Sequence, residues 1–454
     1  MKQRTNYKCS QCGYTSIKYL GKCPMCNSWG TLEEVEEEEN SKSSSKSKYN
    51  KTSEVKVLKD LKSENSDRIF SGIKELDRVV GGGIVKDSVT ILTARPGAGK
   101  STLLLELSNA LGLKDYKVLY ASGEESESQI KNRADRVLKK ISENLFILQT
   151  NSMDKCSEVV YKNDIDVVII DSIQTFVLDE YLPSRAGSPT QSLECTYRAV
   201  EFAKGKKPRM VFIVGQMNKE DQLSGLRSIE HLVDTVLYLE GESGDTLRTL
   251  TATKNRYGAT GEMGFFVMEE NGLLSIDNPQ DYFLINRDNK YVKGSALAAI
   301  KEGSRSIVLE IESLINKSFT PYPSRITESL KKDSLNILIS ILEDSLGMSF
   351  FDKNVILKAV GGLKITDPSI NLAAIMSIAS SYFNKAINDS VVFIGDVSLT
   401  GDIRNTPSTA SKILEADRLG FSKIIVSKKA PIVQTKQAKI ITISRIEDCI
   451  KMYF

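Results

Sequence analysis

The chain has 454 residues, enough for two or three domains, and its 61 basic and 58 acidic side chains leave a net charge of only +3. This near balance excludes a histone-like polycation, so any contact with nucleic acid has to come from a local loop or patch. Its apolar runs fall short of the about 20 residues that a membrane span needs. Residues 1–10 are polar and lack the apolar core of a signal peptide, so we expect a cytoplasmic protein with no membrane partner.

Four of the seven cysteines lie within the first 26 residues, in the pairs Cys9-x2-Cys12 and Cys23-x2-Cys26. Two such pairs can place four thiolates at the corners of a tetrahedron, the closed geometry that Zn²⁺ prefers in structural sites. In a reducing compartment, clustered cysteines indicate a metal rather than disulfides. A segment this short has little core of its own, so the metal would hold its fold together. We therefore predict a zinc module over residues 1–35, which docks either to protein or to DNA.

The following segment, residues 36–65, begins with a run of glutamates and continues with alternating serines and lysines. It shows no apolar periodicity that would indicate a packed helix or strand. This composition is typical of a flexible charged linker.

Between residues 66 and 278, short apolar runs alternate with helical stretches. The runs that we expect to be strands cover residues 88–93, 117–122, 166–170, 209–214 and 235–239. Apolar strands that are separated by helices predict a mainly parallel sheet covered on both faces, and hence an α/β domain.

The stretch that follows the first of these strands matches a P-loop, with alanine in place of its first glycine. Gly97 and Gly99 allow backbone N–H groups to turn toward a phosphate. Lys100 would bridge the β- and γ-phosphates of ATP, and Ser101 would bind Mg²⁺. A degenerate loop that binds no nucleotide is the alternative. The predicted ATP-binding residues are Arg95, Pro96, Gly97, Ala98, Gly99, Lys100, Ser101 and Thr102.

Three acidic residues after later strands are candidates for the chemistry of ATP hydrolysis. Asp171 ends a buried strand, where a carboxylate can hold the water shell of Mg²⁺. Glu124 and Glu125 follow the second strand, the place where RecA-like ATPases keep the glutamate that orients the attacking water. The sequence does not choose between these two glutamates, and both could be solvated loop acids.

Five segments of the chain resemble the bacterial RadA family, also called Sms. They are the four-cysteine module and residues 96–105, 122–126, 230–238 and 253–258. The last segment contains KNRYG, which is similar to the family's KNRFG with Tyr257 in place of phenylalanine. The resemblance covers nearly the whole chain. It implies a RecA-like ATPase that assembles as a hexameric ring on single-stranded and branched DNA and drives branch migration with RecA in homologous recombination.

The resemblance also implies roles for single residues. It places ATP contacts at Lys100 and Ser101, and it suggests that Lys254 and Arg256 reach the nucleotide of a neighbouring subunit. A cation supplied in this way would stabilise charge that develops on the γ-phosphate. Without the resemblance, these two residues would be interpreted as an ordinary basic pair at the end of a strand.

Further candidates lie in loops and at a strand end. Gln216 is placed like the γ-phosphate sensor of RecA-like proteins, although we expect histidine there in the RadA family. Two loops are candidates for the ring channel, where basic side chains could meet DNA phosphates without reading sequence. The predicted DNA-binding residues in these loops are Arg185, Lys219 and Arg227.

The last part of the chain, residues 279–454, reads as a second α/β domain that resembles the proteolytic domain of Lon. Ser369 precedes a predicted helix where Lon carries its nucleophile, but no lysine occupies the matching position of the Lon base. The first lysine beyond that position is Lys412. His231 lies in another domain, where we expect it to be buried, so a serine–histidine dyad is excluded. We therefore predict a non-proteolytic scaffold that helps to form the ring, with Ser369 as a helix N-cap.

Three functions remain in competition at this point. The first is an ATP-driven DNA motor of recombination and repair. The second is an ATP-dependent serine protease of the Lon type. The third is an ATP-gated adaptor that regulates RecA without unwinding DNA.

Overall fold

A computed structural model gives the fold. It describes residues 6–10, 15–16, 21–24, 28–35, 68–216, 227–241, 246–285, 291–387 and 390–454. The predicted linker, residues 36–65, lies outside these ranges. The chain divides into two compact units, Met1–Asn65 and Ser66–Phe454. Among the described residues, no helix combines the length and the apolar character that crossing a membrane requires.

The first unit contains a small antiparallel sheet with the strand order β2-β1-β3. Its strands are β1 (Asn6–Cys9), β2 (Thr15–Ser16) and β3 (Leu32–Val35). Such a short sheet buries little apolar surface, so its stability has to come from another source.

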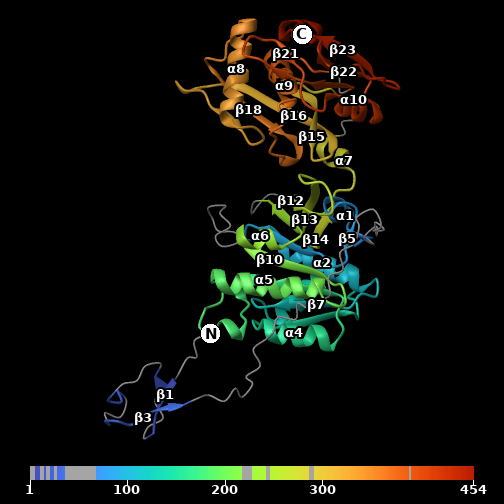
Figure 1. Ribbon diagram of the computed structural model, residues 1–454. Coiled ribbons are helices and arrows are strands. Elements are labelled where there is room, and N and C mark those ends of the chain that lie inside the picture. The colour runs from blue at the N-terminus through green and yellow to red at the C-terminus, as the bar shows by residue number, and fades with distance from the viewer. Residues whose placement is uncertain are drawn as a thin grey trace, which may run out of the picture. The chain divides into compact units, whose positions relative to one another are not determined.

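The second unit contains a nine-stranded sheet of the order β14-β13-β12-β11-β6-β10-β9-β7-β8 (Figure 1). Six neighbouring strands run parallel, and the sequence predicts five of them: β6 (Val89–Ala94), β7 (Val118–Ser122), β9 (Val167–Asp171), β10 (Met210–Gln216) and β11 (Thr235–Glu240). The sixth, β8 (Leu145–Gln149), was not predicted. Three antiparallel strands extend this sheet: β12 (Leu247–Asn255), β13 (Met263–Glu269) and β14 (Gly272–Ser275). A two-stranded ribbon of β4 (Arg68–Ile69) and β5 (Ile84–Val85) precedes it.

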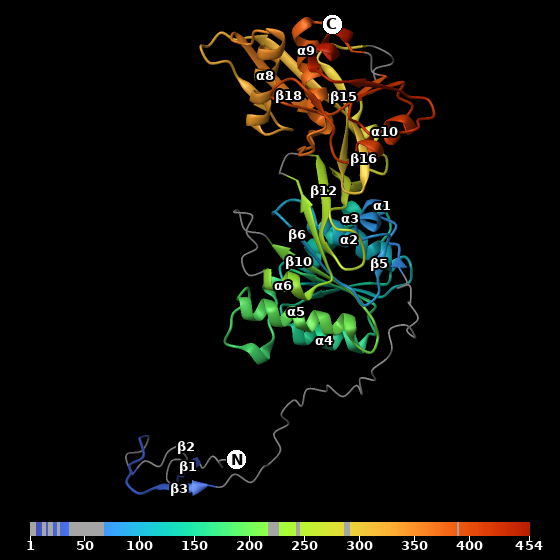
Figure 2. The same cartoon turned by 45° about the horizontal axis from the view of Figure 1, so that its top comes forward.

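Helices cover both faces of this sheet, as predicted. Successive residues of a strand point to opposite faces, and because both sets are apolar here, each face needs a cover. Leu92 packs in one apolar core and its neighbour Ile91 in another. The first core takes side chains from α1 (Lys74–Val79), α2 (Lys100–Gly112) and α3 (Glu127–Val137). The second takes side chains from α4 (Met153–Lys162), α5 (Pro189–Lys204) and α6 (Arg227–Leu232). Figure 2 shows α4 and α5 lying together, away from α1, α2 and α3. Two 3-10 turns, η2 (Ile173–Thr175) and η3 (Asp179–Tyr181), precede α5.

The C-terminal part is an α/β domain around a seven-stranded sheet with the order β17-β18-β16-β15-β19-β22-β23. Its strands are β15 (Ser295–Glu302), β16 (Arg305–Lys317), β17 (Arg325–Thr327), β18 (Lys353–Ala359), β19 (Val391–Ile394), β22 (Lys423–Ser427) and β23 (Lys439–Ile443). Its likeness to the Lon domain stays a prediction.

Helices lie on both faces of this second sheet as well. One face carries α8 (Lys332–Leu346), α9 (Ile370–Phe383) and α11 (Ile446–Tyr453), and the other carries α10 (Thr409–Arg418). The remaining elements are α7 (Pro279–Phe283), η4 (Val360–Gly362), β20 (Asp396–Val397) and β21 (Ile403–Arg404).

The two sheets of the second unit share part of an apolar core. Leu247 and Phe265 from the first sheet belong to the same buried cluster as the core of the C-terminal domain. Phe265 meets Phe283 edge to face, with 5.4 Å between the ring centroids. Aromatic pairs of this geometry stabilise beyond the apolar area that they bury.

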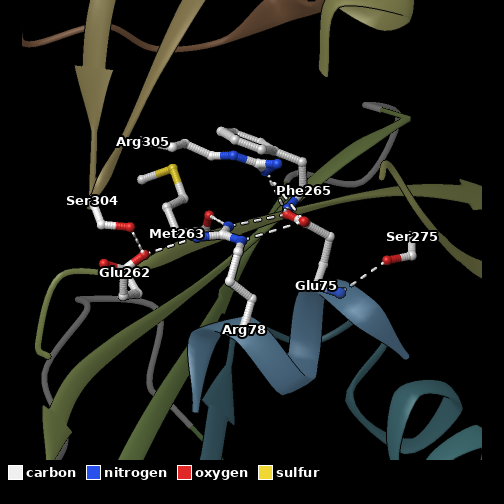
Figure 3. Close-up of polar contacts among 8 residues, drawn as sticks. All are labelled: Glu75, Arg78, Glu262, Met263, Phe265, Ser275, Ser304 and Arg305. Carbon is white, nitrogen blue, oxygen red and sulfur yellow. Dashed lines mark hydrogen bonds and ion pairs between the residues drawn. The ribbon is translucent and has the colours of Figure 1, made fainter. Parts of the chain in front are cut away.

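A polar clasp adds to this contact (Figure 3). Arg305, at the start of β16, donates to both carboxylate oxygens of Glu75 on α1, at 3.2 and 3.1 Å. Arg78 bridges Glu75 and Glu262 at 3.1 and 2.8 Å, and Ser304 donates to Glu262 at 2.7 Å. Because Glu75 is buried, these hydrogen bonds compensate a carboxylate that would otherwise be costly to remove from water.

Candidate nucleotide-binding site

The P-loop connects the end of β6 to the beginning of α2. Gly97 and Gly99 have φ angles of 80° and 106°, in the left-handed region where other residues are strained. A Cβ atom on Gly99 would also lie 2.5 Å from Cε of Met268. Ala94, which replaces the usual first glycine, is the fully buried last residue of β6. The substitution therefore falls within the strand and leaves the two glycines of the turn in place.

Lys100 begins α2, and its side chain folds back over the loop. Nζ donates to the carbonyl oxygen of Ala94 at 2.9 Å and to that of Arg95 at 3.4 Å. Burial lowers the pKa of this ammonium, while the charges of Asp171 and Glu124 act in the opposite direction. The ammonium of Lys100 thus lies close enough to the turn to neutralise the negative charge of a phosphate bound there.

Asp171 is the last residue of β9 and is buried beneath the loop. Its carboxylate accepts a 2.5 Å hydrogen bond from the hydroxyl of Tyr120. Burial raises the pKa of Asp171, and hydrogen bonds from the hydroxyls of Tyr120 and Ser101 lower it. Mg²⁺ prefers hard oxygen ligands. The Asp171 carboxylate and the Ser101 hydroxyl together supply such ligands beside the place where a nucleotide phosphate would bind. The residues present therefore fit Mg-ATP, and Tyr120 is a contact that the sequence did not single out.

The structure separates the two candidate glutamates, which the sequence could not do. Glu124 is exposed and accepts hydrogen bonds from the Ser172 hydroxyl and, at 2.8 Å, from the side-chain amide of Gln216. Glu125 instead forms a two-pronged ion pair with Arg133 on α3, at 2.5 and 2.7 Å. Of the two glutamates, Glu124 is the one whose charge, together with that of Asp171, raises the pKa of Lys100 against the effect of burial.

These groups meet because parallel strands end at the same edge of a sheet. Gln216 ends β10 directly opposite Ala94 of β6, and Ser122 ends β7 opposite Asp171 of β9. The predicted ATP, Mg²⁺, base and sensor residues are therefore brought together at the carboxyl edge of the sheet. This edge is where α/β sheets generally bind their ligands.

Lys254 and Arg256 lie toward the opposite edge of the same sheet. Lys254 pairs with Val236, which in turn pairs with Ile91 near the beginning of β6. Its Nζ donates to the carbonyl oxygens of Glu230 at 2.6 Å and Val233 at 2.8 Å. The guanidinium of Arg256 donates to Asp234 at 3.0 Å. The fold therefore does not bring this pair to the P-loop of its own chain.

The candidate DNA-contacting residues are placed only in part. Arg185 is exposed on the loop between η3 and α5. Lys219 lies outside the described residues, as does the side chain of Arg227, whose backbone begins α6. His231 was expected to be buried, and this expectation was wrong, because its side chain is exposed at the end of the short helix α6.

The predicted zinc ligands are also placed in part. Cys9 ends β1 and Cys23 follows the bridge between Lys22 and Trp29, and both thiols are buried. Cys12 and Cys26 lie outside the described residues. Buried sulfur donors on this small sheet fit a thiolate-bound Zn²⁺, which would supply stability that the sheet cannot provide alone.

Ser369 and Lys412 correct the prediction for the C-terminal domain. Lys412 Nζ donates to Ser369 Oγ at 3.0 Å, so the lysine that follows the matching Lon position along the chain does reach this serine in the fold. Ser369 occupies the N-cap position of α9, but its side chain does not cap the helix and instead donates to the carbonyl oxygen of Ala299 at 3.0 Å. The sequence missed this contact because packing of α10, not spacing along the chain, brings Lys412 inward.

The surroundings of this pair argue against an activated nucleophile. Lys412 forms a 2.7 Å ion pair with Asp367, and Lys412 and Ser369 are both fully buried. Burial raises the pKa of Asp367, but hydrogen bonds from Lys412 and from backbone amides hold it below its usual value. Burial lowers the pKa of Lys412, and its hydrogen bond to Asp367 and the charge of Asp367 act in the opposite direction. Because the 2.7 Å contact with Asp367 holds the pair ionised, the ammonium donates hydrogen bonds to its neighbours and cannot accept a proton from Ser369. The arrangement is a buried ion pair that fastens α10 to the start of α9.

Comparisons with known proteins agree with this geometry. Residues 7–34 match the family model of a rubredoxin metal binding domain, and residues 54–186 match that of an AAA domain. The DNA repair protein RadA of Halalkalibacterium halodurans is 38% identical over 430 residues, which cover 94% of this chain and 93% of that protein. The DNA repair protein RadA of Aquifex aeolicus is 36% identical over 453 residues, which cover 100% of both chains. One solved structure, an ATPase domain, covers 47% of this chain and 93% of its own length, with 19% identity and a TM-score of 0.39.

Proposed function

The chain belongs to the RadA family of DNA repair proteins, and from that premise we propose that it is an ATP-driven DNA motor of recombination and repair. Its AAA domain makes ATP with Mg²⁺ the expected substrate. The motor would act as a helicase that moves DNA branch points during homologous recombination, together with RecA.

The observation that carries the proposal is the convergence of three charged groups at one sheet edge. Lys100 faces the turn that would cradle the phosphates, and Asp171 lies beside the Ser101 hydroxyl. Glu124 projects from the next strand end and is exposed, so a water molecule can reach it. Positioning and charge stabilisation are what phosphoryl transfer asks of a protein, and these residues can supply both.

In the hydrolysis step, Lys100 would stabilise charge on the β- and γ-phosphates, and Asp171 would orient the water shell of Mg²⁺. Glu124 would accept the proton of the attacking water, held in position by Gln216. The Mg²⁺, when bound, would neutralise charge on the phosphate oxygens. Glu125 is assigned a structural role because Arg133 occupies its carboxylate.

The position of Lys254 and Arg256 supports a ring in which each subunit completes the site of the next. Both lie away from the P-loop of their own chain, and Arg256 is half-exposed. A hexameric ring would place this basic pair against the γ-phosphate of a neighbour, so that hydrolysis changes the subunit boundary. Arg185, Lys219 and Arg227 would contact DNA phosphates in the channel.

The remaining parts of the chain would serve this motor. The zinc module, residues 1–35, would dock to a protein or to DNA. The linker of residues 36–65 would connect it to the ATPase core. The ATPase core, residues 66–278, would be joined to the C-terminal scaffold, residues 279–454, by the clasp around Glu75 and Arg305. The buried state of Ser369 disfavours a protease.

DNA-stimulated ATP hydrolysis tests this proposal. The full chain should hydrolyse ATP faster with single-stranded DNA than without it, and Lys100→Ala should be inactive in both conditions. Strand displacement on forked and three-stranded substrates separates a motor from an adaptor that only regulates RecA. A chain that neither binds DNA nor changes its turnover in the presence of DNA would refute the motor.

A further inference from the structure

A cavity of about 460 Å³ adjoins the P-loop on the side away from the hydrolytic residues, within the usual range for small-molecule pockets. One wall is formed by the end of β11, by β12 and by Arg95 of the P-loop. The opposite wall comes from the C-terminal domain, through Tyr282 on α7 and residues 361–364. The cavity therefore lies where the two sheets of the second unit meet.

The lining of this cavity offers surfaces for a flat ring system beside three charged side chains, Arg95, Glu240 and Lys364. Tyr238 and Tyr282 present aromatic surfaces, and Met263 presents a polarizable side chain that adapts to a ring. Gly362, with a φ angle of 73°, has no atom within 4 Å of where a Cβ would be, so its backbone groups face open space, whereas Gly361 packs against Phe283 and Tyr282. Such backbone groups can hydrogen-bond the edge of a heterocycle while the aromatic rings stack on its face.

The cavity adjoins the predicted phosphate site through one residue of the P-loop. Arg95 lines it, and the carbonyl oxygen of Arg95 is 3.4 Å from Nζ of Lys100. In the sheet, β11 flanks β6 on one side, whereas β10, β9 and β7 with the hydrolytic residues lie on the other. A nucleotide whose γ-phosphate faces Glu124 must extend its nucleoside in the opposite direction, toward β11.

We propose that the base and sugar of the nucleoside triphosphate bound at the P-loop occupy this cavity, so that the C-terminal domain forms one wall of the nucleotide site. This inference rests on the proposed ATPase function. It assigns Tyr282 to nucleoside binding and makes the C-terminal domain a direct sensor of the bound nucleotide. The hydroxyl of Tyr282 lies 3.2 Å from that of Thr246 on the loop before β12, so the two walls already touch at the rim.

The test compares two ligands that share phosphates but differ in the nucleoside. Binding of ATP and of inorganic tripolyphosphate is measured with the full chain and with Tyr282→Ala. Stacking of a base on an aromatic ring contributes about 1–3 kcal/mol, so ATP should bind roughly 10-fold more weakly to the variant. Tripolyphosphate should bind unchanged, which also shows that the phosphate site is still folded.

Two further variants sharpen the result. Tyr238→Ala, on the opposite wall, should weaken ATP in the same selective way, and Tyr322→Ala, on an exposed loop of the same domain as Tyr282, should change neither ligand. Equal loss of both ligands in Tyr282→Ala and Tyr238→Ala, or no loss of ATP in either, would overturn the nucleoside site. Lys100→Ala should lose both ligands, and if it retains them the P-loop assignment fails instead.

Discussion

The side-chain amide of Gln216 donates a 2.8 Å hydrogen bond to Glu124, and this contact ties the end of β10 to the loop that follows β7. Gln216 pairs with Ala94, the last residue of β6 before the P-loop. A change at the γ-phosphate that moves Gln216 would therefore move the carboxylate that is proposed to orient water. The sensor and the base would act as one unit, since neither can shift without altering the hydrogen bond between them.

Separate substitution of Glu124 and Glu125 by glutamine tests which of the two is the catalytic base. Glu124→Gln should retain ATP binding and lose roughly 100-fold or more in turnover, because an amide cannot accept the proton of the attacking water. Glu125→Gln should retain most of the turnover and lower the stability, because Arg133 loses its partner. Steady-state hydrolysis and equilibrium ATP binding distinguish the two outcomes. Comparable loss of turnover in both variants would contradict the assignment.

Mixing two inactive variants tests the proposed role of Lys254 in trans. Lys254→Ala and Lys100→Ala should each form rings and fail to move DNA. When the two are mixed, some P-loops from the first variant will face an intact Lys254 from the second, so activity should partly return. Lys204→Ala is the matched control, because Lys204 on α5 pairs at 3.3 Å with Asp234, which is also the partner of Arg256. Absence of any recovery in the mixture would argue for an ordinary structural pair.

Glu106 on α2 should make stability depend on pH. Burial raises the pKa of this carboxyl to about 7, against a backbone hydrogen bond from Leu273 that lowers it. Between about 4.5 and about 7, the folded state binds more protons than the unfolded state, so stability falls as pH rises. Glu106→Gln should therefore raise the free energy of unfolding at pH 8 by roughly 1–3 kcal/mol and have little effect at about pH 4.5.

Denaturant unfolding at the two pH values measures this difference. Glu127→Gln, which changes an exposed acid on α3, is the matched control and should show no such dependence. An equal effect of Glu106→Gln on the free energy of unfolding at both pH values would contradict the raised pKa of Glu106.

The pair of Ser369 and Lys412 should matter for stability and not for proteolysis. Lys412→Ala leaves Asp367 buried without its partner, so unfolding should become easier by about 3–5 kcal/mol. The double variant Lys412→Met with Asp367→Leu should recover much of that loss, because no uncompensated charge remains. Casein should stay intact with the parent chain and with Ser369→Ala. Casein cleavage that disappears in Ser369→Ala would restore the protease alternative.

Local patterns were sufficient to predict the parallel strands of the core except β8, and to predict the P-loop. The buried run that ends at Asp171 and the glycines at 97 and 99 each carry their signal within a few neighbouring residues. The choice between Glu124 and Glu125 could not be made in this way, since it depends on Arg133 and Gln216, which reach them through the fold. The contact between Lys412 and Ser369 was missed for the same reason, because it crosses between two helices.

The antiparallel strands β12 to β14 were also not predicted. Along β12, both faces are largely buried, one by the helices of the core and the other by the C-terminal domain. Apolar and polar residues therefore alternate only over residues 250–253, a short part of this strand. The cavity beside Arg95 depends on this packing and has no signature in the sequence.

Branch migration on a synthetic three-stranded DNA junction tests the central claim most directly, with and without ATP and RecA. The account predicts that the parent chain moves the branch point only when ATP is present, that RecA increases the yield, and that Lys100→Ala leaves the junction unchanged. Movement that is equally fast without ATP, or with Lys100→Ala, would show that the P-loop does not power this protein.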